Sequence, residues 1–350
     1  MKGRVVSKAQ TSTVEQGTQV TPAAIIDLAT SVLGSKTLLS AIELGVFSEL
    51  ASAGALDGET LRERVGLHSR GATDFFDALV ALGMLEREGV RYVNTPATEM
   101  FLNRAKHPYM GDTLELIGHF NFWESLTESL RTGFPQNGTK VTTDLYETFY
   151  ADPLKVTQLA QGMTGAAASR APAIVAKFPW QDYSNMMDIG CAEGAVPVQI
   201  ALAHEHITCG GFDLPPLKPV FDAYVARFGL GERLSFTAGN FFVDPLLKAD
   251  VLIIGDILYG LNIDEKRLLL KKAYDALPEG GALIVYDAIL DDERRSNAYG
   301  LLLSLTMLVT TPGGFGYTGA ECRAWMQETG FRESYVEHLA GPESMVVGIK

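Results

Sequence analysis

The chain has few cysteines and no surplus of positive charge. Its 350 residues hold only Cys191, Cys209 and Cys322, widely spaced and odd in number, which argues against a disulfide framework and a zinc site. The formal net charge is −13, whereas sequence-independent binding of nucleic acid or anionic membranes needs a basic surface. We therefore expect reduced thiols, a cytoplasmic protein, and neither nucleic acid nor membrane among its partners.

Long apolar runs and a signal sequence are also lacking. Residues 1–20 are polar and contain no apolar stretch of the kind that a signal peptide needs, so we interpret them as a disordered arm. The longest apolar runs, such as residues 251–254 and 282–286, are too short to span a bilayer. With 47% hydrophobic and 20% charged residues, the composition is that of a soluble globular protein, and the length suggests two domains.

The first hundred residues show helical spacing followed by a hairpin. Residues 23–50 place apolar side chains three and four positions apart, in a stripe wider than one helix needs for its own core. We interpret this surplus as a subunit interface, with a buried central helix as the alternative. Residues 58–65 and 69–83 predict two helices and residues 84–93 a β-hairpin, which together make the plan of a winged helix.

That plan raises DNA binding as an alternative function. The second helix is apolar and acidic from Asp77 onward, whereas a recognition helix presents Arg, Lys, Asn or Gln to the bases. We therefore assign residues 21–105 to a winged-helix dimerisation domain that forms a homodimer. Residues 106–180 are expected to be a helical linker and substrate-pocket region, with helices over 119–131, 145–150 and 154–175.

Strands and helices alternate in residues 181–350. The expected strands start near Asn185 and follow at residues 207–212, 234–238, 251–255, 282–288, 333–339 and 345–349. This order predicts an α/β domain with a doubly wound, mostly parallel sheet, whose last two strands form an antiparallel hairpin. Ligands bind such sheets at the carboxyl ends of the strands, where this chain has a glycine loop, an acidic residue and two further polar turns.

These motifs together resemble the S-adenosylmethionine-dependent O-methyltransferases of the two-domain, dimeric, small-molecule type, known from plant phenylpropanoid and bacterial natural-product pathways. The resemblance covers nearly the whole chain. It rests on the segments Asp188-Ile-Gly-Cys-Ala-Glu-Gly194, Phe212-Asp-Leu-Pro215, Gly239-Asn-Phe-Phe242, Ala276-Leu-Pro-Glu-Gly-Gly281 and Thr311-Pro-Gly-Gly314. It implies methyl transfer to a small, aromatic secondary metabolite, with S-adenosyl-L-methionine as cofactor.

The resemblance also implies which residues bind the cofactor. The loop with Asp188, Gly190 and Gly194 would hold its methionine part, and Asp213 would accept hydrogen bonds from its ribose hydroxyls. The other implied positions, around the adenine and the reacting end, are Leu214, Gly239, Asn240, Phe241 and Gly255. The family usually has Asp in place of Asn240, whose amide can still accept and donate.

The main departure from the family lies after the fourth strand. The family pattern there approximates His-x-x-His-Asp-Trp, and its second His deprotonates the substrate hydroxyl. This chain has Asp256-Ile-Leu-Tyr-Gly-Leu261, with Tyr259 in the base position, and a phenol with a pKa of about 10 is a poor base at neutral pH. The catalytic candidates are therefore Tyr259, Asp256, Asp287 and His119.

Three interpretations follow from this departure. The enzyme could be an O-methyltransferase that works through Asp256, Asp287 or proximity alone, a methyltransferase acting on carbon or nitrogen, or a relative that has lost methyl transfer. For the substrate side we single out His119, Phe122, Trp123, Met163 and Met307, with plain core packing as the alternative for each. No cluster of His, Cys and carboxylates has metal-ligand spacing, so no metal is expected.

Overall fold

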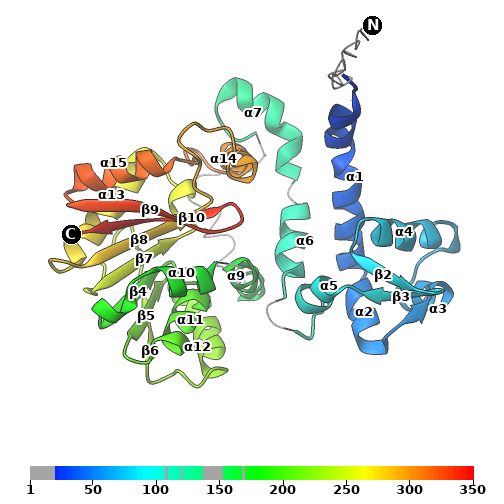
Figure 1. Ribbon diagram of the computed structural model, residues 1–350, viewed down its shortest axis with the longest axis horizontal. Coiled ribbons are helices and arrows are strands. Elements are labelled where there is room, and N and C mark those ends of the chain that lie inside the picture. Colours follow the sequence, from blue (N-terminus) through cyan, green and yellow to red (C-terminus); the bar gives the residue numbers. More distant parts are fainter. Residues whose placement is uncertain (1–19, 107–108, 120, 137–152, 168–169) are drawn as a thin grey trace, which may run out of the picture.

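The computed structural model describes residues 20–106, 109–119, 121–136, 153–167 and 170–350. Two lobes are joined through helices that lie between them (Figure 1). The predicted arm, apart from its last residue, and the predicted helix over residues 145–150 lie outside the described residues.

The N-terminal lobe packs helices on a small antiparallel sheet. Its elements are α1 (Ala23–Glu43), α2 (Val46–Ala53), β1 (Leu56–Asp57), α3 (Gly58–Arg64), α4 (Ser69–Ala81), β2 (Leu85–Glu88), β3 (Arg91–Asn94) and α5 (Pro96–Phe101). The strand order is β1-β3-β2. The predicted order of helix, helix and hairpin is confirmed. The helical stretch predicted over residues 23–50 is interrupted at Gly45, whose φ of 72° suits glycine. Phe47, Phe76 and Tyr92 form the centre of the core.

Helix α1 leaves much of its apolar surface uncovered. The exposed fractions of Ile25, Leu28 and Leu33 are 74%, 77% and 67%. By length and hydropathy α1 could also cross a membrane, and only 11% of its apolar window is buried. The expectation that no apolar segment is long enough for this was therefore wrong. That expectation was based on uninterrupted apolar runs, whereas Thr and Ser interrupt the apolar residues of α1 without making the helix polar.

The middle of the chain differs from its predicted helices. The expected helix over residues 119–131 is instead the end of α6 (Gly111–His119), a 3₁₀ turn η1 (Asn121–Ser125) and α7 (Leu126–Thr132). Asn, Phe and Trp have modest helix propensity, and η1 packs against a C-terminal helix. The expected helix over residues 154–175 is divided into α9 (Pro153–Ala167) and α10 (Ala171–Lys177). Pro172, which cannot donate a helical hydrogen bond, lies in the first turn of α10.

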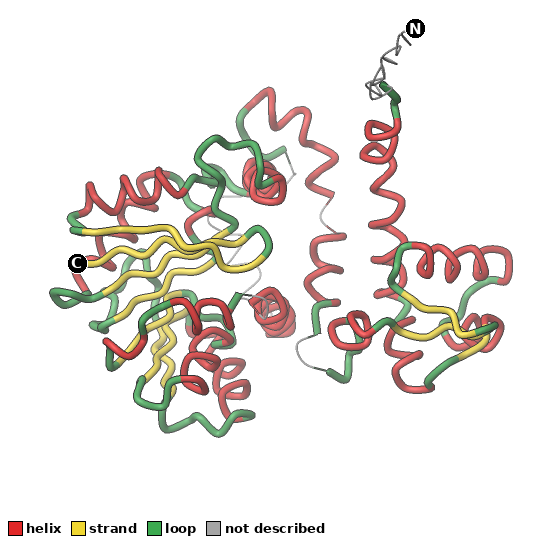
Figure 2. Tube along the Cα trace, in the orientation of Figure 1, coloured by secondary structure: helices red, strands yellow, loops and turns green. Residues whose placement is uncertain are grey.

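The C-terminal lobe is built on one seven-stranded sheet (Figure 2). Its strands are β4 (Asn185–Ile189), β5 (Thr208–Asp213), β6 (Leu234–Ala238), β7 (Val251–Gly255), β8 (Ala282–Asp287), β9 (Glu333–Ala340) and β10 (Glu343–Ile349), in the order β6-β5-β4-β7-β8-β10-β9. The first five are parallel, and β10 is antiparallel to both neighbours. The predicted sheet and its terminal hairpin are confirmed.

Helices cover both faces of this sheet. They are α10, α11 (Ala195–Ala203) and α12 (Lys218–Ala226) on one face, and α13 (Ile263–Ala276) and α15 (Gly319–Thr329) on the other. Successive strand residues point to opposite faces, so Val251 and Ile253 join the first core while Leu252 and Ile254 join the second. Helix α14 (Ala298–Thr310) lies instead against η1 and α7. All four side chains of β7 are fully buried, which fixes the turn that follows it.

Candidate active site

The turn between β4 and α11 presents bare backbone. Gly190, Ala192 and Gly194 have φ values of 77°, 49° and 86°, a region where glycine avoids steric cost. The Gly190 N–H donates to the Phe212 carbonyl at 2.8 Å. A Cβ on Gly190 would lie 2.4 Å from Cδ1 of Ile257. The turn therefore has no room for a side chain at Gly190 and is tied to the end of β5.

Asp213, at the end of β5, is fixed by this turn. Its Oδ2 accepts the Ala192 N–H at 2.9 Å and its Oδ1 accepts the Leu214 N–H at 2.7 Å. Burial raises the pKa of Asp213 to about 6, against the opposing effect of these two N–H groups. A carboxylate oxygen accepts more than one hydrogen bond, so the group is oriented and can still bind ligand hydroxyls. Asp188 lies beside it, and burial, followed by the charge of Asp213, raises its pKa well above the ordinary value.

The turn after β6 is connected to Asp213 as well. The Gly239 N–H donates to the Asp213 carbonyl at 2.9 Å. The side-chain oxygen of Asn240 accepts the Phe242 N–H at 2.9 Å, which leaves its NH₂ group as the donor for a ligand. Phe241 is partly buried against the core beside α13. The predicted adenine residues thus lie next to the predicted ribose residue.

The end of β7 carries a buried ion pair that the sequence reasoning missed. Asp256 follows Gly255 with a φ of 54°, a strained conformation that often occurs at functional sites. Its Oδ2 accepts a short hydrogen bond from Arg170, whose other terminal nitrogen donates to Glu343 at 2.8 Å. The guanidinium carbon also lies 5.4 Å from the ring centroid of Tyr286.

The charges in this cluster influence one another. Burial raises the pKa of Asp256 although Arg170 opposes the shift. Burial also raises the pKa of Glu343, to about 7. For Arg170 burial acts in the lowering direction, but its acidic and phenolic neighbours, Tyr259 among them, hold its pKa above the ordinary value. A lone arginine among the small residues before Pro172 was the only sequence signal for this cluster.

Tyr259 lies in a 3₁₀ turn, η4 (Leu258–Gly260), that contacts α14. A Cβ on Gly260 would lie 4.0 Å from the sulfur of Met307. Because α14 also contacts η1, the fold brings Met307 and the segment of Trp123 to the same side of the site. Trp123 is 39% exposed. The side chains of His119 and Phe122 lie outside the described residues.

Two other predicted residues have different surroundings. Met163 is half-buried on α9, the helix whose Val156 and Ala160 pack beside Ala192 of the glycine turn. Asp287 is buried at the end of β8, where its Oδ2 accepts a short hydrogen bond from the Tyr317 hydroxyl. Burial, and next the charge of Asp256, raises its pKa well above the ordinary value. Among the catalytic candidates, Asp256 and Tyr259 are the pair that adjoins Arg170.

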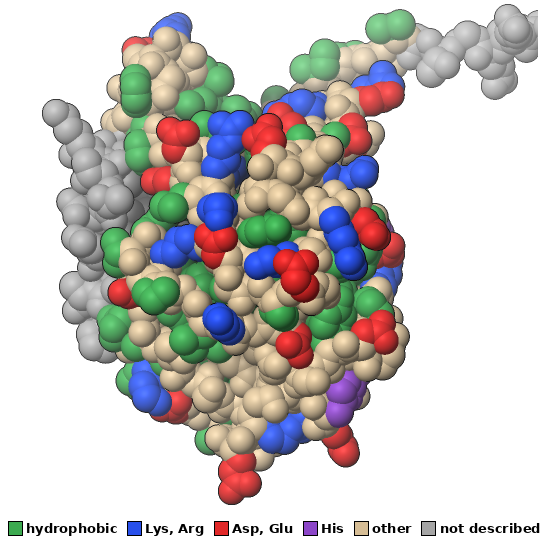
Figure 3. Space-filling view, turned by 90° about the vertical axis from the view of Figure 1, so that its left-hand side faces the viewer, with side chains coloured by type: hydrophobic (Ala, Val, Ile, Leu, Met, Phe, Trp, Pro, Cys, Tyr) green, Lys and Arg blue, Asp and Glu red, His purple; other side chains and the backbone are tan. Residues whose placement is uncertain are grey.

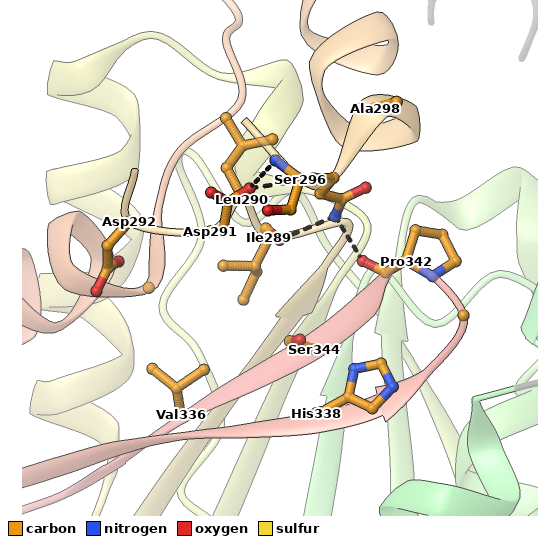
Figure 4. A pocket seen from close by; sticks show the side chains of 13 residues that line it. Ile289, Leu290, Asp291, Asp292, Ser296, Ala298, Val336, His338, Pro342 and Ser344 are labelled. Atoms are coloured by element: carbon orange, nitrogen blue, oxygen red, sulfur yellow. Dashed lines mark hydrogen bonds between the residues drawn. The ribbon is translucent and has the colours of Figure 1, made fainter. Parts of the chain in front are cut away.

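A separate hollow of about 590 Å³ lies on the surface beyond β8, between residues 289–298 and the turn before β10 (Figure 4). Pro342 and His338 line it from the hairpin side, and the Asn297 amide donates to the Pro342 carbonyl at 2.8 Å. None of the predicted site residues lines this hollow. The candidate site is the one predicted at the carboxyl ends of β4, β5, β6 and β7.

Comparison with known proteins decides the family. Residues 123–332 match the O-methyltransferase domain, and residues 26–104 match the O-methyltransferase dimerisation domain. The chain belongs to the O-methyltransferase family. The tetracenomycin polyketide synthesis 8-O-methyl transferase TcmO of Streptomyces glaucescens is 38% identical to this chain, and the match covers 94% of this chain and 97% of TcmO. The N,N-dimethyltransferase OxyT of Streptomyces rimosus is 33% identical to this chain, and the match covers 90% of this chain and 92% of OxyT.

The fold of this methyltransferase agrees with its family. The crystal structure of human N-acetylserotonin methyltransferase in complex with SAM has a TM-score of 0.86 and 25% identity, and the match covers 97% of this chain and 99% of the human one. The chain is therefore an S-adenosylmethionine-dependent methyltransferase with a small-molecule substrate, and it has the class I methyltransferase fold. The resemblance on which the sequence prediction rests is confirmed.

The residues present fit the cofactor. The turn at Gly190 offers backbone without a side chain, and Asp213 offers oriented oxygens for hydroxyl groups. The N-terminus of α11, directly after Gly194, offers unpaired N–H groups and partial positive charge that suit a carboxylate. When bound, S-adenosylmethionine supplies an electrophilic methyl group on a sulfonium.

The close contact at Gly190 generates a first prediction. Gly190→Ala should lower the free energy of unfolding by about 1–2 kcal/mol for its positive φ and by about 1–3 kcal/mol more for overpacking against Ile257. It should also weaken S-adenosylhomocysteine binding. Gly89→Ala is the control, because Gly89 has a φ of 65° and no atom within 4 Å of an added Cβ. Denaturant unfolding measures the stability of the two variants. An equal loss of unfolding free energy in Gly190→Ala and Gly89→Ala would contradict the packing argument.

The titration of Asp213 generates a second prediction. Since its pKa is about 6, lowering the pH from 7.5 to 5 protonates the carboxylate and removes an acceptor for ligand hydroxyls. The dissociation constant of S-adenosylhomocysteine should therefore rise several-fold over this range. Asp213→Asn should weaken binding about tenfold at pH 7.5, the size of a hydrogen bond to a charged group, and flatten the pH dependence. Calorimetry should show neither effect for Asp222→Asn, on the exposed side of α12.

Proposed function

We propose that this methyltransferase methylates a hydroxyl group of a small aromatic natural product, with Asp256 as the group that receives the hydroxyl proton. The observation that carries this proposal is the position of Asp256, two residues before the η4 turn and in an ion pair with Arg170. Its raised pKa makes it a stronger base than an ordinary carboxylate. TcmO, named as an 8-O-methyl transferase of polyketide synthesis, supports an aromatic acceptor.

The roles of the surrounding residues follow from this assignment. Arg170 orients the Asp256 carboxylate, since the ion pair fixes one of its two oxygens and leaves the other for the acceptor. Tyr259 forms part of the wall and contacts the acceptor through its phenol. Met307, and with it Met163 and Trp123, provides apolar surface for a ring, where thioether and aromatic groups make favourable contacts. The methyl transfer itself is a displacement that gains chiefly from positioning.

Cofactor binding is proposed at the residues that the sequence indicates. Asp188, Gly190 and Gly194 bind the methionine part, and Asp213 the ribose. Residues 214, 239–241 and 255 enclose the adenine and the reacting end. The proposed domain limits are 21–105, 106–180 and 181–350, and the proposed location is the cytoplasm.

Transfer to nitrogen is the second candidate, because OxyT is named as an N,N-dimethyltransferase. An amine acceptor also has to lose a proton, and Asp256 could receive it in the same way. Incubation with S-adenosylmethionine and paired phenol and aniline acceptors, followed by mass spectrometry, separates the two reactions. Methylation confined to the aniline would overturn the proposal of O-methylation.

The ion pairs of Arg170 allow a sharp test of Asp256. Asp256→Asn should lower kcat by about 10²–10⁴-fold, the usual contribution of a general base. Glu343→Gln is the matched control, because it removes the other ion pair of the same guanidinium without changing the proposed base. Both variants should lower stability by a similar amount, about 3–5 kcal/mol for a broken buried pair. A loss of kcat that is equal in both variants would show that Asp256 acts only through Arg170.

The exposed face of α1 supports a homodimer through the N-terminal lobe. Leu28→Glu should convert the dimer to a monomer, because it places a charge in an apolar contact. Val243→Glu is the control, since Val243 lies in the C-terminal lobe with the same 77% exposure. Light scattering after size-exclusion chromatography measures both masses, and a dimer that survives in Leu28→Glu would exclude this face as the interface.

Binding of DNA by the N-terminal lobe finds no support. In that lobe, the helix in the place of a recognition helix is apolar and acidic from Asp77 onward. On the face of the C-terminal lobe seen in Figure 3, acidic and basic side chains are interspersed. The net charge of −13 also opposes binding to a polyanion.

A further inference from the structure

Helix α13 carries two lysines that contact loops at opposite ends of the ligand site. Lys266 lies in its first turn and is fully buried, whereas Lys272 is half-buried. Six residues separate them, which corresponds to about 9 Å along the helix axis. The helix itself is rigidly held, because Leu269, Leu270 and Ala273 are buried in the core. Two ammonium groups thus project from one fixed support.

Lys266 joins two loops on the acceptor side. Its Nζ donates to the carbonyl of Leu261, directly after η4, and to that of Phe315 at 3.2 Å. It also lies 3.5 Å from the centroid of the Phe315 ring, a favourable cation–π contact in a desolvated place. The two loops touch, since a Cβ on Gly314 would lie 2.7 Å from the Gly260 carbonyl oxygen. Lys266 therefore closes the contact between residues 260–262 and 311–318, which flank Met307.

Lys272 makes the corresponding contacts on the cofactor side. Its Nζ donates to the carbonyls of Phe241 and Asp244, both at 2.6 Å. These carbonyls belong to the loop of residues 239–250 between β6 and β7. Other bonds of the loop lie within its first turn, where the Asp244 carboxylate accepts the Asn240 N–H at 2.8 Å and the Asn240 carbonyl accepts the N–H groups of Val243 and Asp244 at 3.1 and 2.8 Å. Two of the three donors of the ammonium group thus satisfy these two carbonyls.

We propose that Lys266 and Lys272 are separate positioning residues, Lys266 for the acceptor side of the site and Lys272 for the adenine side. This rests on the proposed assignment of Met307 to the acceptor and of residues 239–241 to the cofactor. Each lysine fixes its loop without touching a ligand. Loss of one ammonium releases one loop and leaves the other in place, because α13 stays anchored by its apolar residues.

Hydrogen–deuterium exchange and calorimetry with S-adenosylhomocysteine test this on the full-length protein. Lys272→Met should speed exchange over residues 239–250 at least fivefold and weaken S-adenosylhomocysteine binding about three- to tenfold. Lys266→Met should speed exchange over residues 260–262 and 311–318 and change that binding less than twofold. Methionine keeps the length of the side chain and removes the charge and the donors. Lys271→Met, which removes an exposed partner of Asp275 on the same helix, is the control and should change neither quantity.

The outcomes are distinct. Faster exchange in both loops for either variant, or in neither, would overturn the proposal, as would unchanged S-adenosylhomocysteine binding in Lys272→Met. If Lys266→Met does not fold, Lys266→Arg replaces it, because the larger guanidinium cannot bond both carbonyls in the same place, and the same localised exchange is expected. Failure of the wild type to bind S-adenosylhomocysteine would instead contradict the cofactor assignment, and the exchange patterns would still decide the roles of the lysines.

Discussion

The arrangement of the reacting end depends on one buried guanidinium. Arg170 stands at the start of α10, yet it bonds to Asp256 at the end of β7 and to Glu343 at the start of β10. Removing a charged arginine from water is costly, and an ion pair offsets this cost only with good geometry and further hydrogen bonds. Arg170 meets this condition, because it bonds to two acidic partners and lies over the ring of Tyr286. The segment just before α10 is thereby fixed to the ends of β7 and β10, beside the proposed ligand site.

The two ends of the proposed site differ in the groups that form them. At the cofactor end, backbone groups dominate, since the Gly190, Ala192 and Gly239 N–H groups all bond to Phe212 or Asp213. Neighbouring strands and small residues in their turns are sufficient to form this end. The proposed acceptor end draws on the segments η1, η4 and α14, which are far apart in the sequence. Such a wall can change its residues without disturbing the sheet, which suits a family whose members act on different acceptors.

The sequence predicted the sheet, its terminal hairpin and the positions of the turns, because strand periodicity and glycine turns are local signals. The position of Asp213 beside the glycine turn also followed, since parallel strands bring their carboxyl ends together. Arg170 was missed because its partners are 86 and 173 residues away and no local pattern connects them. The break between α9 and α10 was missed although Pro172 marks it. Asp287 illustrates a further limit, since its bond to Tyr317 could not be read from spacing.

The buried guanidinium offers a physical reason for the proposed replacement of the family histidine by Tyr259. A histidine at position 259 would lie close enough to Arg170 for their charges to interact, as the phenol of Tyr259 does. Repulsion from the guanidinium would lower the pKa of an imidazole and disfavour the protonated form that a general base has to reach. The side chain of Tyr259 carries no positive charge, so it meets no such repulsion from the guanidinium. The proposed proton acceptor is then an anion that the guanidinium orients, and Asp256, in contact with Arg170 and two residues before η4, meets that condition.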